Sequence, residues 1–137
     1  MEKIRLLRLA ERGNITVDFA PLTRNKAFSI TLGGKKYIAV DKSIPPESSE
    51  ERVVLAHELG HLKTDSLYGK EDTPLTCRRA ERRADVWAIR SLVPLSRLRE
   101  AIRRGDESVS ELAERFSVTE EFMQKAIKYY CEQKSVG

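Results

Sequence analysis

Two histidines and a glutamate stand in an order that can bind a metal ion and activate water: His57-Glu58-Leu59-Gly60-His61. On a helix, the two imidazoles lie one turn apart on the same side, where both can reach one tetrahedral Zn²⁺ at about 2.0–2.1 Å. Glu58 then projects beside them and can take a proton from water on the metal, whose pKa the ion lowers to roughly 7. The segment therefore predicts two metal ligands, His57 and His61, and a general base, Glu58.

The same residues could also decorate a helix surface by chance, because the chain holds 21 acidic residues. Against this, His57 and His61 are the only two histidines in the sequence. A chance H-E-x-x-H pattern is expected in roughly one chain of this size in a few hundred. The motif alone therefore favours a functional metal site.

A catalytic zinc takes three protein ligands and keeps a fourth position open. Downstream, Glu81 and Asp85 stand one helical turn apart. Glu81 can bind the metal while Asp85 accepts a hydrogen bond from the free ring N–H of His57 or His61. We predict one Zn²⁺ per chain with Glu81 as the favoured third ligand, although Mn²⁺ or Fe²⁺ can occupy similar ligands. Residue chemistry leaves other donors open: Asp65, Glu71, Asp72, Cys77 and Asp85 itself.

The flanking sequence predicts an α+β fold that holds these residues. A short helix should end at Gly13-Asn14, after which apolar and polar residues alternate over 15–19 and 28–32, and a β-prone run covers 37–40. Gly33-Gly34 can form the tight turn of a hairpin. We therefore expect a small antiparallel sheet at the N-terminal end, packed on the helix that carries His57 and His61.

Capping residues predict where the later helices begin. Ser48 and Glu51 form a capping box before a helix that should run to about Lys63. Thr73, followed by a proline, should begin a second long helix that ends near residue 92. Beyond Pro94, the pattern predicts three further helices.

The organisation expected from these elements is one domain over residues 1–137. Residues 1–43 should form a helix plus the small sheet, and residues 47–104 the metal-binding helices. Residues 106–132 should form a helical pair that resembles a helix-turn-helix. The sequence contains no repeat and no evident interdomain linker.

Composition limits the class of protein and its location. The formal net charge is +4 and the pI is near 9.2, with nine arginines between residues 77 and 104 and six acids between 106 and 124. This asymmetry could orient a partner, although solvated helix faces explain it as well. Cys77 and Cys131 form no CxxC pair, and no apolar run is long enough to span a membrane. We expect a cytoplasmic protein with reduced thiols.

Three motifs in order resemble the ImmA/IrrE family of metallopeptidases: A-H-E-L-G-H-L at 56–62, E-R-R-A-D at 81–85 and L-V-P at 92–94. The likeness spans most of the chain. It implies His57, His61 and Glu81 as zinc ligands and Glu58 as the catalytic residue. Members of this family look like gluzincins, and the best understood cleave helix-turn-helix repressors of phages, mobile elements or stress regulons. The resemblance thus implies a metalloendopeptidase whose substrate is such a repressor.

The motifs do not identify the residue that stabilises the tetrahedral oxyanion. The histidine that stabilises the tetrahedral oxyanion in some gluzincins is missing, because both histidines are committed to the metal. Tyr68, Arg78 or a backbone amide could donate in its place. A substrate peptide could pair with a sheet edge over 27–32 or 37–40.

The main alternative function is DNA or protein binding by the helix-turn-helix-like segment 112–119, with a zinc site that is not catalytic. Glu120 and Glu121 would open the recognition helix, and acids there repel DNA. The intact Glu58 argues against a site that has lost hydrolysis. We therefore expect a protein substrate and no direct DNA binding, while the sequence leaves the oligomeric state open.

Overall fold

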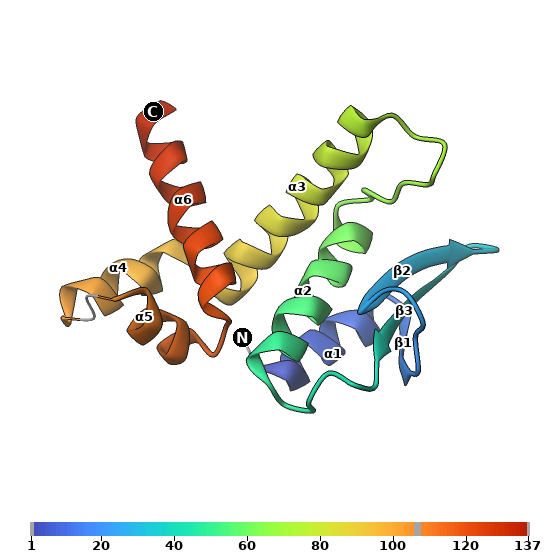
Figure 1. The fold of residues 1–137 in the computed structure, drawn as a ribbon, viewed down its shortest axis with the longest axis horizontal. Helices are drawn as coiled ribbons and strands as arrows, with labels where there is room; N and C mark the ends of the chain where they lie inside the picture. The colour runs from blue at the N-terminus through green and yellow to red at the C-terminus, as the bar shows by residue number, and fades with distance from the viewer. Residues whose placement is uncertain (1, 106–107, 137) are drawn as a thin grey trace.

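The computed structural model of the protein describes residues 2–105 and 108–136. Helices and strands follow one another along the chain as a helix, three strands and five further helices in the described residues (Figure 1). Their bounds are α1 (Lys3–Arg12), β1 (Ile15–Ala20), β2 (Ala27–Leu32), β3 (Lys35–Asp41), α2 (Ser49–Lys63), α3 (Pro74–Leu92), α4 (Leu95–Arg103), α5 (Val109–Phe116) and α6 (Glu120–Val136). The α+β class is as predicted. The predicted helical pair began at residue 106, but residues 106 and 107 lie outside the described part, and the pair observed is α5 and α6.

The sheet is mixed, so the expectation of a wholly antiparallel sheet is wrong for one strand. β2 and β3 form the predicted antiparallel hairpin through Gly33-Gly34, whose φ angles are 54° and 79°. β1, however, pairs with β3 in parallel, and the strand order is β1-β3-β2. The chain leaves β1 at Pro21 and reaches the far edge through residues 21–26, which are too many for a tight hairpin. As a result, β2 is an edge strand beside α2.

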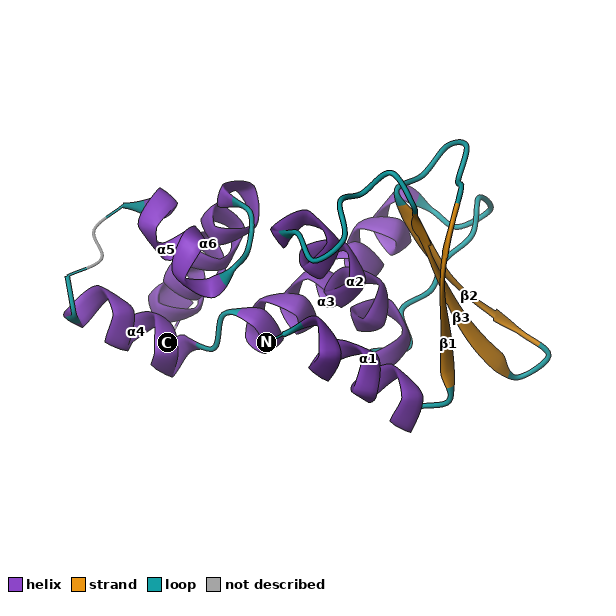
Figure 2. Cartoon of the chain, turned by 90° about the horizontal axis from the view of Figure 1, so that it is seen from below, coloured by secondary structure: helices purple, strands orange, loops and turns teal. Residues whose placement is uncertain are grey.

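One part of the core lies where α1 and α2 meet one face of the sheet (Figure 2), and the same buried cluster continues through α3 to α6. Leu55 and Leu59 of α2 are fully buried, as is Leu6 of α1. Ile38 and Val40 of β3 alternate inward and are also buried. This packing fixes α2 against the sheet and leaves its opposite side for α3.

Helices α2 and α3 approach closely at Gly60. A Cβ atom built on Gly60 would lie only 2.6 Å from the backbone oxygen of Ala84. Any side chain at this position would push the two helices apart. Gly60 therefore brings Glu81, one turn before Ala84, close to the histidines that flank the glycine on α2.

The predicted caps are present at the starts of these helices. The Ser48 hydroxyl accepts from the amide of Glu51 at 3.1 Å, and the Thr73 hydroxyl accepts from the amide of Thr76 at 3.1 Å. Glu51 reaches back as expected, but it accepts from the amide of Glu47 at 3.0 Å, one residue before the cap. The helix starts were thus encoded locally.

The C-terminal helices are tied to α3 by two tyrosines. The Tyr130 hydroxyl donates to the carbonyl of Val93 at 2.7 Å, and the Arg90 guanidinium donates to the Tyr129 hydroxyl at 2.8 Å. α6 and α3 lie close at one end and diverge towards the other (Figure 1). Among the described residues, no helix is both long and apolar enough to span a membrane.

Candidate metal centre

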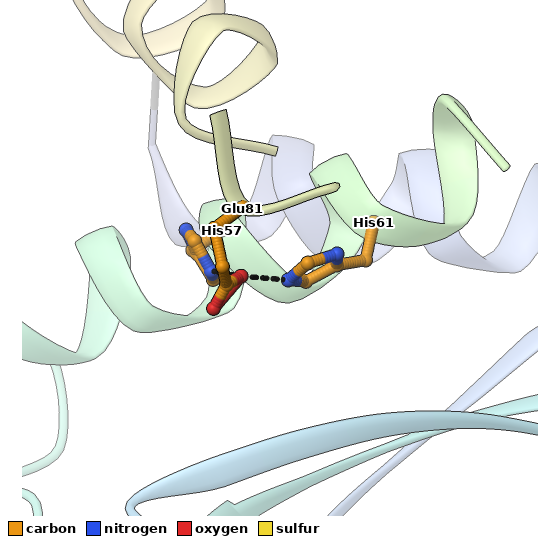
Figure 3. Close-up of side chains that lie close together, drawn as sticks. All are labelled: His57, His61 and Glu81. Carbon is orange, nitrogen blue, oxygen red and sulfur yellow. Dashed lines mark hydrogen bonds and ion pairs between the residues drawn. The ribbon is translucent and has the colours of Figure 1, made fainter. Parts of the chain in front are cut away.

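His57, His61 and Glu81 converge at one point between α2 and α3 (Figure 3). The Glu81 carboxylate oxygen Oε2 lies 2.6 Å from Nε2 of His61 and 3.1 Å from Nε2 of His57. Both histidines come from α2, one turn apart, and α3 supplies the glutamate from the opposite side. The one-turn spacing that predicted the pair of imidazoles has therefore placed both ring nitrogens towards the same carboxylate.

The other ring nitrogens are held by fixed acceptors. Nδ1 of His57 donates to Oδ1 of Asp85 at 2.8 Å, and Nδ1 of His61 donates to the backbone carbonyl of Ser66 at 2.9 Å. Because each neutral imidazole carries its proton on Nδ1, each Nε2 offers a lone pair. The sequence left open whether Asp85 would contact His57 or His61, and in the structure it orients His57.

This arrangement fits a divalent metal ion. When both imidazoles are neutral, two Nε2 lone pairs and a carboxylate oxygen face one another. All three are hydrogen-bond acceptors, and no donor lies among them. A cation at their meeting point would satisfy all three. Two donors that each lie about 2.0–2.1 Å from a tetrahedral ion would be roughly 3.3 Å apart. The separations of Glu81 Oε2 from Nε2 of His57 and His61 are 3.1 and 2.6 Å, so Glu81 and His61 would have to move slightly apart to admit an ion. A set of two histidines and one carboxylate, with oriented ring protons, is typical of catalytic zinc.

The other carboxylate and thiolate donors that the sequence left open do not join this cluster in the described residues. Asp72 accepts from the amide of Gly69 at 2.7 Å, and the thiol of Cys77 faces the carbonyl of Asp72 at 3.9 Å. Asp85 is occupied by His57 and has Lys125 at 3.8 Å. The geometry therefore agrees with Glu81 as the third ligand.

Glu58 lies beside the cluster and is held by the edge strand. The hydroxyl of Ser29 on β2 donates to Oε1 of Glu58 at 2.9 Å. Burial raises the pKa of Glu58, and the hydrogen bond from Ser29 opposes this rise without cancelling it. A half-buried carboxylate with a raised pKa is suited to accept a proton.

The pair formed by His57 and Asp85 is strongly polarised. Burial lowers the pKa of His57, but the hydrogen bond and charge of Asp85 outweigh it, so that the pKa lies above 6.5. Burial also opposes ionisation of Asp85, yet the hydrogen bond from His57 holds its pKa below 3.8. These directions describe the protein without a bound ion, and in that state each partner favours the charged form of the other.

Of the two predicted oxyanion donors, the structure brings Tyr68 to the centre. Its ring lies 6.1 Å from the ring of His61, centroid to centroid, and it lines a cavity of about 310 Å³ with Glu58 and Glu81. Partial burial and the neighbouring Glu81 raise the pKa of Tyr68 and keep its hydroxyl protonated. Arg78 is exposed and faces a different hollow, between α3 and α6.

A cleft passes over the cluster along β2. The cavity that holds Tyr68 shares Ala27, Glu58 and Glu81 with a neighbouring cavity of about 420 Å³. That second cavity is walled by the start of β2, by α2 and by Phe122 and Lys125 of α6. The helical pair at the C-terminal end therefore contributes directly to the candidate site.

Sequence reasoning missed three groups at this centre: Ser29, the carbonyl of Ser66 and Lys125. Ser29 pairs with the buried Ile38 and shares its inward face, so a polar residue at an inward position was an available signal. The Ser66 carbonyl is a backbone group and leaves no trace in residue type. Lys125 reaches Asp85 only through the packing of α6 on α3.

Comparison with known proteins agrees with this geometry. No curated protein matches the chain. A peptidase family does match it, described as the IrrE N-terminal-like domain, over residues 10–128. The match includes α2, α3 and the first nine of the 17 residues of α6, and hence every residue of the candidate centre. The chain belongs to the IrrE N-terminal-like domain family of M78 peptidases.

Proposed function

We propose that the protein is a zinc-dependent endopeptidase that cleaves a helix-turn-helix repressor of a phage, mobile element or stress regulon. The observation that carries the activity is the convergence of both Nε2 atoms on Glu81, with Glu58 alongside. Membership of a peptidase family supports the same reaction. The two histidines and Glu81 would hold one zinc ion.

Held by His57, His61 and Glu81, a zinc ion would lower the pKa of a bound water to about 7 and would polarise the carbonyl of the scissile bond. Glu58 accepts a proton from the attacking water and delivers it to the leaving amine. Tyr68 donates a hydrogen bond to the carbonyl oxygen as negative charge develops on it. Asp85 keeps the His57 proton on Nδ1, so that Nε2 would be available to bind the metal.

The substrate would lie as an added strand along β2. β2 is the edge strand, and its hydroxyl at Ser29 already contacts the proposed base. A peptide paired with this edge gains main-chain hydrogen bonds and passes directly over Glu58. Of the two strands that the sequence offered, 27–32 is therefore favoured, because β3 has neighbours on both sides.

The class of substrate rests on family resemblance and not on a feature of the cleft. Cys77 carries a free thiol and the sequence has no CxxC pair, which supports a reducing compartment such as the cytoplasm, where repressors act. We place the activity there.

The test is to mix the purified zinc-loaded protein with helix-turn-helix repressors of the same genome, beginning with one encoded beside its gene. Wild-type protein should cut the substrate at one site. Glu58→Gln should bind one equivalent of zinc and lower the rate about 10²- to 10⁴-fold, since the general base is lost. Glu71→Gln, an exposed glutamate outside the cluster, is the matched control. Unchanged cleavage by Glu58→Gln would refute the proposed base.

DNA binding by α5 and α6 is the alternative function, and the position of α6 disfavours it. α6 packs against α3 through Tyr129, and its first turn carries the exposed Glu120 and Glu121. A salt-dependent shift of duplex DNA at roughly sub-micromolar protein would support this alternative.

A further inference from the structure

A groove of about 490 Å³ runs between α3 and α6, next to the metal centre. On α3 its lining residues recur at 78, 82, 86 and 89, which is one helix face. On α6 they recur at 125, 128, 129 and 132, again one face. The groove occupies the space in which these two helices diverge (Figure 1).

Basic residues outnumber acidic ones on the walls of this groove, four to three. Arg78 and Arg82 line it from α3, and Lys125 and Lys128 line it from α6. Apart from Glu81 and Asp85, which serve the histidines, the acid among the described lining residues is Glu132, 4.0 Å from Arg82. Two ion pairs cross the groove, Arg82 with Glu132 at 4.0 Å and Lys125 with Asp85 at 3.8 Å, so the positive charge that an anionic ligand would neutralise is concentrated at Arg78 and Lys128.

The floor of the groove is apolar. Ile89 and Tyr129 are buried beneath it, and Val86 is half-buried. The guanidinium of Arg82 lies over the ring of Tyr129, 6.0 Å from its centroid, which holds this charge at the rim. Basic rims above an apolar floor match an extended peptide that carries both acidic and apolar side chains.

The groove continues into the active-site cleft. Glu81, Asp85 and Lys125 line both the groove and the cavity that contains His57 and Glu58. A chain that lies in the groove therefore reaches the proposed scissile position without leaving the surface. This continuity suits a peptide substrate, because its scissile bond must reach the metal centre. A nucleic acid ligand would not need a path to the metal centre.

We propose that the groove between α3 and α6 binds an acidic segment of the protein substrate that flanks the scissile bond. The proposal rests on the proposed function, because the occupant is the peptidase's own substrate. Arg78, Arg82 and Lys128 act in binding and not in the chemical step. The helix-turn-helix-like pair thereby becomes one wall of the substrate site.

Helix α3 supplies its own control. Arg79 and Arg83 are exposed and follow Arg78 and Arg82 directly in sequence, yet neither lines the groove. The double variants Arg78→Glu/Arg82→Glu and Arg79→Glu/Arg83→Glu change the net charge equally and on the same helix. A difference between them reports the groove and not the overall charge of the protein.

The experiment measures peptide binding by fluorescence anisotropy, with zinc-loaded full-length protein that carries Glu58→Gln to prevent cleavage. The probes are a labelled peptide of alternating Glu and Leu, its Lys and Leu counterpart, and a labelled DNA duplex. The acidic peptide should bind in a salt-sensitive way, measured at about 0.05 and 0.3 M salt. The Arg78/Arg82 variant should bind it roughly tenfold or more weakly, and the Arg79/Arg83 variant within about twofold of the parent.

Equal weakening by both double variants would overturn the proposal, as would equal binding of the acidic and basic peptides or tighter binding of the duplex. Because the assay needs no cleavage, it is independent of the repressor experiment. Binding of the acidic peptide without cleavage of any repressor by wild-type protein would contradict the proposed function and leave the groove as a site for acidic peptides. Cleavage of a repressor with an unchanged KM in Arg78→Glu/Arg82→Glu would contradict the groove alone.

Discussion

Replacement of Gly60 by alanine tests whether the close approach of α2 and α3 builds the metal centre. The added Cβ would lie 2.6 Å from the Ala84 oxygen and 3.0 Å from its Cα, and real Cβ contacts essentially never fall below 3.0 Å. The obstacle is backbone, which no side-chain rotation can remove. The two helices must therefore separate by at least 0.4 Å, the difference between 2.6 and 3.0 Å.

Two opposing terms set the expected stability of Gly60→Ala. Alanine within a helix is favoured over glycine by about 1 kcal/mol, so helix propensity alone predicts a more stable protein. Overpacking between two fixed backbones costs about 1–3 kcal/mol. We expect the second term to win, with a net destabilisation of up to about 2 kcal/mol. The sign of the change decides whether the helix contact matters.

The same displacement should weaken zinc binding. The shift moves α3 as a body, so Asp85 recedes from His57, whose ring it orients, and Glu81 is displaced by more than the roughly 0.2 Å that metal–ligand geometry tolerates. We expect the zinc affinity to fall about 10- to 100-fold. Urea unfolding with and without zinc, and competition with a chelator, measure the two effects.

Gly69→Ala is the matched control, because a Cβ at Gly69 meets nothing within 4 Å. It should bind zinc like the wild type and keep or slightly raise stability. If Gly60→Ala were more stable by about 1 kcal/mol and bound zinc normally, the reasoning from helix approach would be wrong.

Three further results are expected. Ser29→Ala should lower kcat/KM about tenfold and leave zinc affinity unchanged, because Glu58 loses its 2.9 Å hydrogen bond. Ser29→Thr should restore most of the activity. If threonine did not restore it, the loss would point to folding instead. Asp85→Asn should weaken zinc binding about 10- to 100-fold in chelator competition, because His57 loses the acceptor that fixes its tautomer, and wild-type affinity would remove Asp85 from the centre. The third result concerns pH, because the pKa of His57 is raised above 6.5. Protonated His57 therefore stabilises the metal-free protein fully below pH 6.5, and this stabilisation is lost as pH rises through the raised pKa. Zinc needs neutral His57, so the increase in Tm on adding zinc should grow between about pH 6 and 8, and a constant increase would contradict this linkage.

Helix boundaries were predictable because the signals that set them are local. Ser48 and Thr73 each accept the amide three residues ahead, as their sequence context indicated. Strand partners were not predictable in the same way. Alternation identified β1 as a strand, but whether it pairs with β2 or β3 depends on the path of the chain over residues 21–26. The parallel pairing of β1 and β3 therefore had no signal within either strand.

The candidate ligands were predictable because helix geometry links residue spacing to direction. Residues four apart face the same way, so His57 and His61, and separately Glu81 and Asp85, formed two usable pairs. The sequence left open which histidine Asp85 contacts, and the packing of α3 on α2 determines that it is His57. The partner of His61 is a backbone carbonyl in the turn after α2, a group that every residue carries.

The C-terminal pair shows why a local likeness does not fix a role. The pattern over 112–119 describes a helix, a tight turn and a helix, and the structure has this shape, with Ser117 at a φ of 55° in the turn. DNA binding, however, requires a free basic face on the second helix. The basic residues of α6 that line a hollow, Lys125 and Lys128, face α3 and the metal centre, and the exposed first turn is acidic. The charge distribution relative to the neighbouring helix therefore argues for a peptide, where the helix-turn-helix shape alone would have suggested DNA.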